Sequence, residues 1–435
     1  MTSELSRKRI VELDRARVWH PYTSADAWEK TDPIVVARAE GSSFWDVDGK
    51  KYLDGNSSWY VAVLGHGHPR LLRVLREQSE RLAHVALAGI THEPAALLAE
   101  ELVAVAPRGL SRVFYTDNGS TSIEVAVKVA VQAWRQRGAP KKTRFLALEG
   151  AFHGDTLAPT SLGGVELFRR PFAGIVFDCV HAPFPSPDAY ERAYAAIAAI
   201  VEREKDTLAG VVIEPMVQGT AGMRIHEPRF LSELRELTRK NDVLLIADEV
   251  FAGYGRTGRM WACDHAGITP DVMCLGKAFS AMIPMGATLV TDEIFDAFRG
   301  AKDRAFYYGH TFCGNPIGAS LAREVLAIYR DEAIVEQVQA KAPRITQAFE
   351  RIASIPGVER VRSIGMIGAA DLAPSGDGGY LGSSGWRVYE EARKRGAYLR
   401  PLGDTVYVTP PLNMSEADLD ALLGILEESI RSIQR

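Results

Sequence analysis

Short apolar runs separated by longer amphipathic stretches dominate the middle of the chain. The runs have the length and composition of buried strands and cover residues 112–116, 145–148, 210–214, 243–248, 272–275 and 287–290. Such a rhythm of strands and helices is typical of an α/β domain with a mostly parallel sheet. We therefore expect a large α/β domain here, with helices flanking the sheet.

The two ends of the chain have different textures. Residues 34–54 alternate around an Asp48-Gly49 turn, which predicts a hairpin. After about Leu321 come a long helical stretch, strand-like residues 358–372, a loop rich in Gly and Ser at residues 374–385, and a last helix. Ser415 and Asp418 form a capping signature for that helix. Its apolar residues repeat at helical spacing: Leu419, Leu422, Leu423, Leu426, Ile430 and Ile433.

These patterns divide the chain into three parts. We expect an N-terminal segment, residues 1–65, that joins the small domain, a large domain at residues 66–325, and a small α+β domain at residues 326–435. The length of 435 residues, with 46% hydrophobic and 24% charged, fits a globular protein of two or three domains.

Charge and cysteine content exclude several classes of protein. A net charge of −4 lacks the basic surplus that nucleic-acid binding needs, so we expect no nucleic-acid partner. No run of 18 apolar residues predicts a membrane span, and the N-terminus does not resemble a signal peptide. The four cysteines form no Cys-x-x-Cys pair, which favours a reducing, cytoplasmic location.

The strand at residues 243–248 ends in acids. Ligands of open α/β sheets lie beyond the carboxyl ends of strands, which places Asp248 where a cofactor binds. Strand alternation puts Asp248 and Val250 on one face and Glu249 on the other. The alternative is a carboxylate that merely ends the strand.

A lysine follows the next apolar strand, 29 positions beyond Asp248. Lys277 stands after Gly276 among small and apolar neighbours. Desolvation there lowers the pKa of an amine and favours its reactive neutral form, as a Schiff-base lysine requires. A solvated surface lysine is the alternative.

A third feature is the start of a helix after residues 112–116. Gly119 and Ser120 precede a predicted capping box of Thr121 and Glu124, and the helix is expected to end at Arg137-Gly138. Free backbone N–H groups at such a start suit a phosphate, although an ordinary capped helix is the alternative. The Walker sequence is absent, which disfavours a nucleoside triphosphate.

Two further segments carry aromatic or imidazole groups. Phe152, after residues 145–148, can stack on a flat heterocycle, whereas the neighbouring His153 is interpreted as a packed core histidine. His66 and His68 have the spacing of a metal pair, but no third ligand is near, so we expect no metal site.

A carboxylate, a lysine, a phosphate-binding helix start and an aromatic ring together meet the needs of pyridoxal phosphate. With the segments 248–258, 275–277 and 309–316, they make almost the whole chain resemble the fold-type-I, class III aminotransferases. The resemblance implies pyridoxal phosphate as cofactor, bound by Lys277, with Asp248 keeping the ring nitrogen protonated and Lys277 moving the substrate proton. It also implies a homodimer with shared active sites, in which Thr311, beside Gly309 and His310, reaches the phosphate from the partner subunit.

Other segments resemble one branch of that family, the 7,8-diaminopelargonic acid aminotransferases of biotin biosynthesis. These segments are residues 19–24, 57–60, 84–94, 216–219 and 398–403. The resemblance implies that 8-amino-7-oxononanoate is aminated, that Tyr22 and Trp59 line its pocket, and that Arg400 grips its carboxylate.

Two positions depart from that branch. Phe152 replaces a tyrosine, so the ring is retained but a hydroxyl is lost, and Tyr22 and Asp155 would take over the contact to the substrate amine. His310 replaces the proline of the form that uses S-adenosylmethionine. The resemblance to the branch still implies S-adenosylmethionine as the donor, whereas the histidine is similar to the variant that takes lysine, so lysine is the alternative.

Two other functions remain open at this point. One is a class III transaminase for other ω-amino acids or diamines. The other is a dinucleotide-binding protein without catalysis. The Gly-x-Gly-x-x-Gly motif typical of such proteins is absent after the first strand of this sequence, which disfavours that function.

Overall fold

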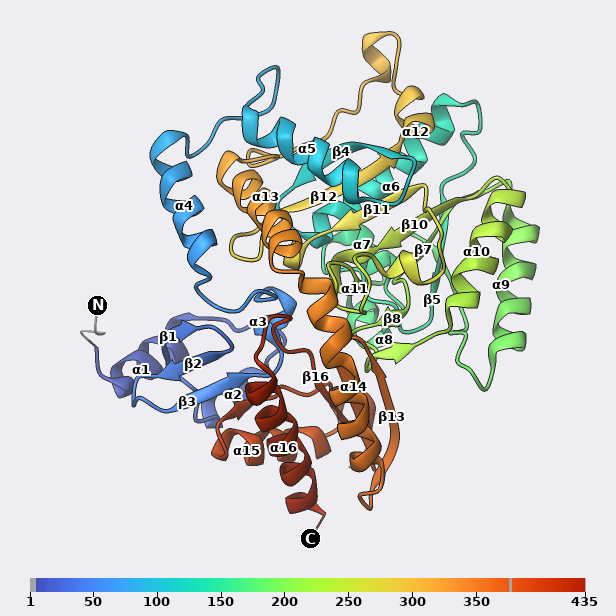
Figure 1. The fold of residues 1–435 in the computed structure, drawn as a ribbon. Coiled ribbons are helices and arrows are strands. Elements are labelled where there is room, and N and C mark those ends of the chain that lie inside the picture. The colour runs from blue at the N-terminus through green and yellow to red at the C-terminus, as the bar shows by residue number, and fades with distance from the viewer. Residues whose placement is uncertain (1–4, 375–377, 435) are drawn as a thin grey trace.

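A seven-stranded sheet with helices on both sides forms the body of the protein (Figure 1). The computed structural model describes residues 5–374 and 378–434. The strands, in sheet order, are β4 (Leu110–Thr116), β12 (Gly286–Thr291), β11 (Val272–Leu275), β10 (Leu244–Asp248), β7 (Leu208–Ile213), β5 (Arg144–Leu148) and β6 (Cys179–Ala182). Only β12 runs antiparallel to its neighbours, so the expected mostly parallel sheet is confirmed. The edge strand β6 was not predicted.

Helices cover both faces of this sheet because its strands are apolar on both sides. Leu244 and Ile246 of β10 pack in the cluster that contains α6, and Leu245 between them packs in the cluster that contains α9 and α10. The helices of this part are α4 (Pro69–Arg81), α5 (Glu93–Val105), α6 (Gly119–Gln136), α7 (Leu157–Leu162), α8 (Glu166–Arg169), α9 (Tyr190–Glu204), α10 (Pro228–Lys240), α11 (Glu249–Ala252), α12 (Asp292–Asp296) and α13 (Pro316–Asp331).

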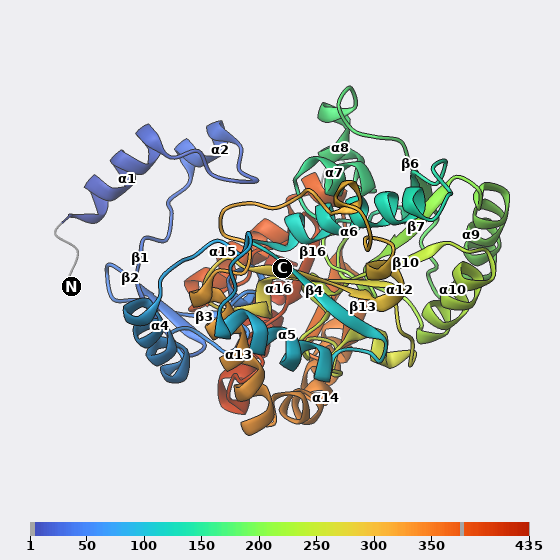
Figure 2. The same cartoon turned by 90° about the horizontal axis from the view of Figure 1, so that it is seen from above.

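The N-terminal hairpin lies beside the C-terminal part of the chain (Figure 1). Its strands β2 (Ser43–Asp46) and β3 (Lys51–Asp54) pair antiparallel, as predicted, and β1 (Val36–Glu40) joins β2. On the other side, β3 pairs in parallel with β15 (Ala397–Tyr398). The pairing of β3 with β15 thus links the hairpin to the C-terminal part. Helices α1 (Arg7–Arg17) and α2 (Ala25–Lys30) have no buried residues and stand apart from the body (Figure 2).

The C-terminal part is an α+β layer. Its sheet has the order β13 (Val358–Ile364), β14 (Ile367–Leu372) and β16 (Thr405–Val408), flanked by α14 (Ile334–Ala353), α15 (Ser384–Lys394) and α16 (Glu416–Ile433). The cap of α16 is confirmed, because the Ser415 side chain accepts a hydrogen bond from the Asp418 N–H. The loop predicted at residues 374–385 overruns the start of α15, and its residues 375–377 lie outside the described part.

The predicted domain limits remain a prediction, and the proposed boundary at residue 325 falls inside α13. A small two-stranded sheet, β8 (Val217–Gln218) and β9 (Arg224–Ile225), lies in sequence between β7 and β10, and its strand β9 contacts β13. No helix in residues 5–374 and 378–434 is both long enough and apolar enough to cross a membrane.

One buried cation ties the two parts together near the end of β10. Arg256, 1% exposed, donates from Nη1 to the carbonyl of Pro410 at 2.7 Å and to that of Met366 at 3.3 Å. Burial lowers its pKa to about 10. These carbonyls belong to the C-terminal part, so the loop that follows α11 is fixed to that layer.

Replacing Arg256 with methionine leaves these buried carbonyls without a donor. We expect R256M to lose roughly 2–4 kcal/mol in free energy of unfolding, measured by urea denaturation. Arg259, exposed on the same loop, is the matched control. R259M should stay within about 0.5 kcal/mol of the wild type. An R256M protein as stable as R259M would contradict the role of Arg256.

Candidate active site

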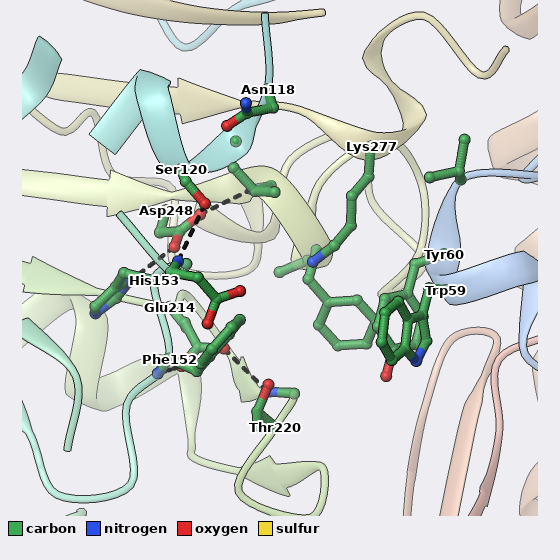
Figure 3. A pocket seen from close by; sticks show the side chains of 18 of the residues that line it. Trp59, Tyr60, Asn118, Ser120, Phe152, His153, Glu214, Thr220, Asp248 and Lys277 are labelled. Carbon is green, nitrogen blue, oxygen red and sulfur yellow. Dashed lines mark hydrogen bonds and ion pairs between the residues drawn. The ribbon is translucent and has the colours of Figure 1, made fainter. Parts of the chain in front are cut away.

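A cavity of about 570 Å³ opens beyond the carboxyl ends of β5, β7, β10 and β11 (Figure 3). Its walls combine the large sheet with the segment after β3 and the loop after β15. Most of the residues predicted for the site line it: Tyr22, Trp59, Gly119, Ser120, Phe152, Asp155, Asp248, Val250, Lys277 and Arg400. The structure thus brings together side chains from distant parts of the chain.

The pairing of two strands places the lysine opposite the acid. Asp248 is the register partner of Cys274 in the parallel pair of β10 and β11, and Lys277 follows three residues later. The backbone of Lys277 is left-handed, with φ of +47°. Its side chain points into the cavity (Figure 3), with Nζ 5.1 Å from the ring centre of Tyr60 and 5.5 Å from that of Phe251.

Electrostatics at Lys277 match the sequence-based expectation. Burial lowers the pKa of the Lys277 amine, and the negative charge of Asp248 partly opposes this shift. No acidic oxygen within residues 5–374 and 378–434 lies within 4 Å of Nζ. The amine is therefore biased toward its neutral, nucleophilic form.

Asp248 is 4% exposed and is held at both oxygens. Oδ1 accepts the N–H of Val250 at 3.1 Å, and Oδ2 lies 2.7 Å from Nδ1 of His153. Burial alone would lower the pKa of His153, but the hydrogen bond and charge of Asp248 outweigh it and raise the pKa. The interpretation of His153 as a core residue is therefore incomplete, because its buried ring is the partner of Asp248.

A second buried acid, Glu214, was missed by the sequence analysis. Its two carboxylate oxygens accept the N–H groups of Phe152 and Gly219, both at 3.0 Å. Burial raises its pKa to about 7. Glu214 follows β7 directly, so the strand-end rule that identified Asp248 points to it as well.

The start of α6 is built differently from the prediction. Asn118 is the N-cap and exchanges hydrogen bonds with Thr121, whereas Glu124 accepts the N–H of Ala158 at 2.8 Å. The predicted Thr121–Glu124 capping box is therefore wrong, because the helix begins three residues earlier than that box requires. The predicted end at Arg137-Gly138 is confirmed.

This helix start has the features of an anion site. The Thr121 N–H is taken by the Asn118 side chain, and the hydrogen bonds of the described residues include none from the N–H groups of Gly119 and Ser120. A Cβ on Gly119 would lie 2.6 Å from Val250 Cγ1, so only glycine lets the helix approach so closely. Two free N–H groups at the positive end of an 18-residue helix suit a phosphate.

A left-handed backbone turn carries the aromatic residues Trp59 and Tyr60 that line one wall of the cavity. All four residues of α3 (Ser57–Tyr60) have positive φ, between 45° and 73°. Side-chain hydrogen bonds hold this left-handed turn: Ser57 Oγ donates to Thr409 O at 2.6 Å, Ser58 Oγ donates to Asp54 Oδ2 at 2.9 Å, and the Tyr60 and Tyr407 hydroxyls lie 2.9 Å apart. The turn directs Trp59 and Tyr60 to the cavity (Figure 3).

Arg400 lies at the Trp59 side of the cavity. Its guanidinium stacks 5.1 Å from the ring centre of Trp59 and 5.5 Å from that of Trp386. Within the described residues, no acidic side chain lies within 4 Å of it. The planar cation is thus available to a carboxylate ligand.

Aromatic contacts frame the mouth of the cavity. Tyr22 donates a hydrogen bond to Asp155, and burial followed by that bond raises the pKa of Tyr22. Phe168, which the sequence analysis missed, packs edge-on against Tyr22 at 5.4 Å and against Tyr380 at 4.9 Å, and Phe152 lies 6.1 Å from it.

Three predicted residues stand outside this assembly. Gly309, His310 and Thr311 are not among the residues that line the cavity in the described chain. His310 Nε2 lies 3.6 Å from Asp117 Oδ1. The predicted roles of these three residues therefore stay predictions.

The two histidines considered for a metal have protein partners. His66 Nε2 lies 2.9 Å from Asp54 Oδ2, and His68 Nε2 lies 3.4 Å from Glu332 Oε1. Over the part of the chain that is described, no three His, Cys, Asp or Glu side chains gather as metal ligands.

Comparisons with known proteins agree with this geometry. A family model described as aminotransferase class III matches residues 24–430. The chain is 39% identical to the adenosylmethionine-8-amino-7-oxononanoate aminotransferase of Geobacter sulfurreducens, covering 97% of both chains. It is 39% identical to the protein of that name from Synechococcus elongatus, over 96% of this chain and 99% of the other.

Solved structures of transaminases have the same fold as this chain. The adenosylmethionine-8-amino-7-oxononanoate aminotransferase of Methanocaldococcus jannaschii superposes with a TM-score of 0.94 at 31% identity, covering 98% of this chain and 99% of that one. An omega transaminase of Pseudomonas jessenii in complex with PMP superposes with a TM-score of 0.92 at 28% identity, covering 97% and 98%.

Stability against pH tests the environment of Glu214. Because its pKa is raised from 4.5 to about 7, the native state holds this proton more tightly than the unfolded state. The free energy of unfolding should therefore fall as pH rises from 4.5 to 7, by up to roughly 3 kcal/mol, and this contribution should then level off.

The E214Q variant should lack this decline when urea unfolding is followed between pH 5 and 8. E149Q, which changes an exposed acid after β5, should follow the wild type. Parallel wild-type and E214Q profiles would show that Glu214 titrates normally.

Proposed function

The chain belongs to the class III aminotransferases, and from this we propose that it aminates 8-amino-7-oxononanoate to 7,8-diaminononanoate in biotin biosynthesis. The observation that carries the proposal is the cavity itself. It holds Lys277 and Asp248 at its base and, on another wall, Arg400, which has no carboxylate within 4 Å among the described residues. That arrangement suits a substrate that reacts at one end and carries a carboxylate at the other.

Enzymes of this family use pyridoxal phosphate, and the residues of the cavity fit it. We assign its aldehyde to Lys277, its ring nitrogen to Asp248, its phosphate to the N–H groups of Gly119 and Ser120, and its ring faces to Phe152 and Val250. When bound, pyridoxal phosphate supplies an aldehyde that takes up the amino group and a ring that withdraws electrons from the carbon that loses its proton.

The protein's own side chains manage the protons. Asp248, fixed by His153 and by the Val250 N–H, holds a proton on the ring nitrogen. With pyridoxal phosphate bound, the Lys277 Nζ would be the base that takes a proton from the donor carbon and returns it at the next position. The lowered pKa of Lys277 favours the neutral amine, which both the attack on the aldehyde and the uptake of the substrate proton require.

Other residues orient the substrates. Arg400 binds the carboxylate, Trp59 covers the aliphatic chain, and Tyr22 with Asp155 contacts the substrate amine, replacing the hydroxyl that Phe152 lacks. The rings of Phe251 and Tyr60 lie beside the Lys277 amine and reduce its contact with water.

The working form in this proposal is a cytoplasmic homodimer. His310 and Thr311 would complete the site of the partner subunit, with Gly309 beside them and Thr311 on the phosphate. Large apolar side chains near this segment and the N-terminus are exposed, among them Trp19 at 91% and Phe312 at 56%, which fits a covered surface. All four cysteines are free, as a reducing compartment favours.

The amino donor is tested by a half-reaction. The holoenzyme is mixed with S-adenosylmethionine or with lysine, and the loss of its visible absorbance is followed. 8-Amino-7-oxononanoate is then added and diaminononanoate is measured by mass spectrometry. We expect S-adenosylmethionine to bleach the absorbance and the keto acid to restore it with product formation.

Each other outcome has a defined meaning. Bleaching by lysine alone would make lysine the donor and leave the aminated substrate unchanged. A protein that ignores 8-amino-7-oxononanoate but turns over simple amines with pyruvate would be an ω-amino-acid transaminase instead, and the proposal would fail.

A further inference from the structure

A second cavity, of about 1250 Å³, adjoins the active-site cavity. It lies where the small β8–β9 sheet meets β13 and β14 of the C-terminal layer. Thr220, Tyr380 and Leu402 line both cavities and so form a common wall. Nothing in the proposed transamination uses this second space.

One arginine in this cavity is held in place without an acidic partner. The guanidinium of Arg224, on β9, lies 4.0 Å from the ring centre of Phe184. Within the described part of the chain, no carboxylate lies within 4 Å of it. Burial lowers its pKa, the negative charges of Glu149 and Glu214 oppose this shift, and the positive charges of Arg360 and Arg362 add to it. Stacking fixes the plane of the cation and leaves its N–H edges for a ligand.

The other two arginines are already engaged. Arg362 pairs with Asp371 at 2.7 Å and donates to the carbonyls of Gly222 and Met223. Arg360 pairs with the same carboxylate at 3.0 Å. An anion that binds Arg224 therefore breaks no existing ion pair, whereas binding to Arg360 or Arg362 would compete with Asp371.

A second buried side chain beside Arg224, Gln218, donates from its amide nitrogen to the Glu149 carbonyl at 3.3 Å but has no partner at its amide oxygen among the described residues. Gln218 is 1% exposed, and its Oε1 has no hydrogen-bond donor in the described structure. Its position is close to that of Arg224, because a Cβ on Gly150 would lie 3.3 Å from Gln218 Oε1 and 2.9 Å from Arg224 Nη1. Glycine at position 150 keeps this corner of the cavity open.

The remaining lining restricts the ligand. Apolar walls come from Val165, Phe184, Met216, Ile225 and Leu402, and acidic side chains also line the cavity: Asp188, Glu227, Glu359, Asp371 and Asp404. The acids disfavour a dianion such as phosphate, because like charges repel in a partly desolvated space. A single negative charge on an apolar chain satisfies both the arginine and the apolar walls.

We propose that this cavity is a second ligand site, which binds a carboxylate carried on an apolar chain with Arg224 holding the carboxylate. Because Tyr380 and Leu402 belong to both cavities, a molecule bound here touches the wall of the active site. The site is separate from the carboxylate position assigned to Arg400, and does not depend on the proposed reaction.

Equilibrium dialysis of the holoenzyme with radiolabelled heptanoate tests the proposal. We expect two heptanoate molecules per protomer, one at Arg400 and one at Arg224. The R224Q variant should lose one site and R400Q the other, each by at least roughly tenfold in Kd. R360Q, which changes an exposed arginine of the same cavity, is the matched control and should keep both sites.

Competing probes define the chemistry. Excess inorganic phosphate should leave heptanoate on the Arg224 site of R400Q, and heptylammonium should not displace it. R224K, which keeps the charge, should retain the site with weakened affinity, and thermal unfolding should show that both Arg224 variants are folded.

The opposing results are equally specific. Wild-type stoichiometry in a folded R224Q protein, or displacement of heptanoate by phosphate in R400Q, would overturn the second site. If R400Q kept both sites while R224Q lost one, the carboxylate assignment of the proposed function would fail and the second site would stand.

Discussion

The burial of an amine and a carboxylate at the ends of two neighbouring strands is the constraint on which this structure depends. The parallel register of β10 and β11 sets Asp248 beside Cys274 and puts Lys277 just beyond the sheet. The surroundings of both groups limit how far water stabilises their charges, so each charge needs compensation from nearby groups. Asp248 receives it from His153 and the Val250 N–H, whereas Lys277 is biased toward the neutral amine. Because of this difference, Asp248 can hold a proton on the nitrogen of a bound ring while the neutral amine of Lys277 attacks an aldehyde.

The rest of the site supports these two groups at some energetic cost. Four successive left-handed residues, Ser57–Tyr60, and Lys277 itself occupy backbone conformations that cost roughly 1–2 kcal/mol each. Hydrogen bonds to Asp54, Thr409 and Tyr407 from the left-handed turn offset part of this cost. Because Thr409 and Tyr407 belong to the C-terminal layer, as do the carbonyls that bind Arg256, the geometry of the cavity depends on how that layer packs against the large sheet.

The features that the sequence predicts are those set by residues close together in the chain, whereas contacts between distant residues could not be predicted. Asp248, Lys277, the hairpin and α16 were predicted because short local patterns specify strand ends, turns and caps. The pairing of His153 with Asp248 joins residues 95 positions apart, and no local pattern encodes it. Phe168 and the left-handed turn were missed for the same reason, since tertiary contacts determine both. Glu214 is different, because the strand-end rule applies to it and was not used there. Gly309, His310 and Thr311 stay predictions because a single chain does not bring them to the cavity.

The most direct test of this assignment is the visible absorbance of the protein reconstituted with pyridoxal phosphate, compared between the wild type, K277A and K141A. Lys141 is exposed and is not among the residues that line the cavity, so it serves as the control. We predict that the wild type and K141A show the band of pyridoxal phosphate joined to a lysine, and that K277A loses both the band and turnover. A band that survives unchanged in K277A would contradict the central role of Lys277.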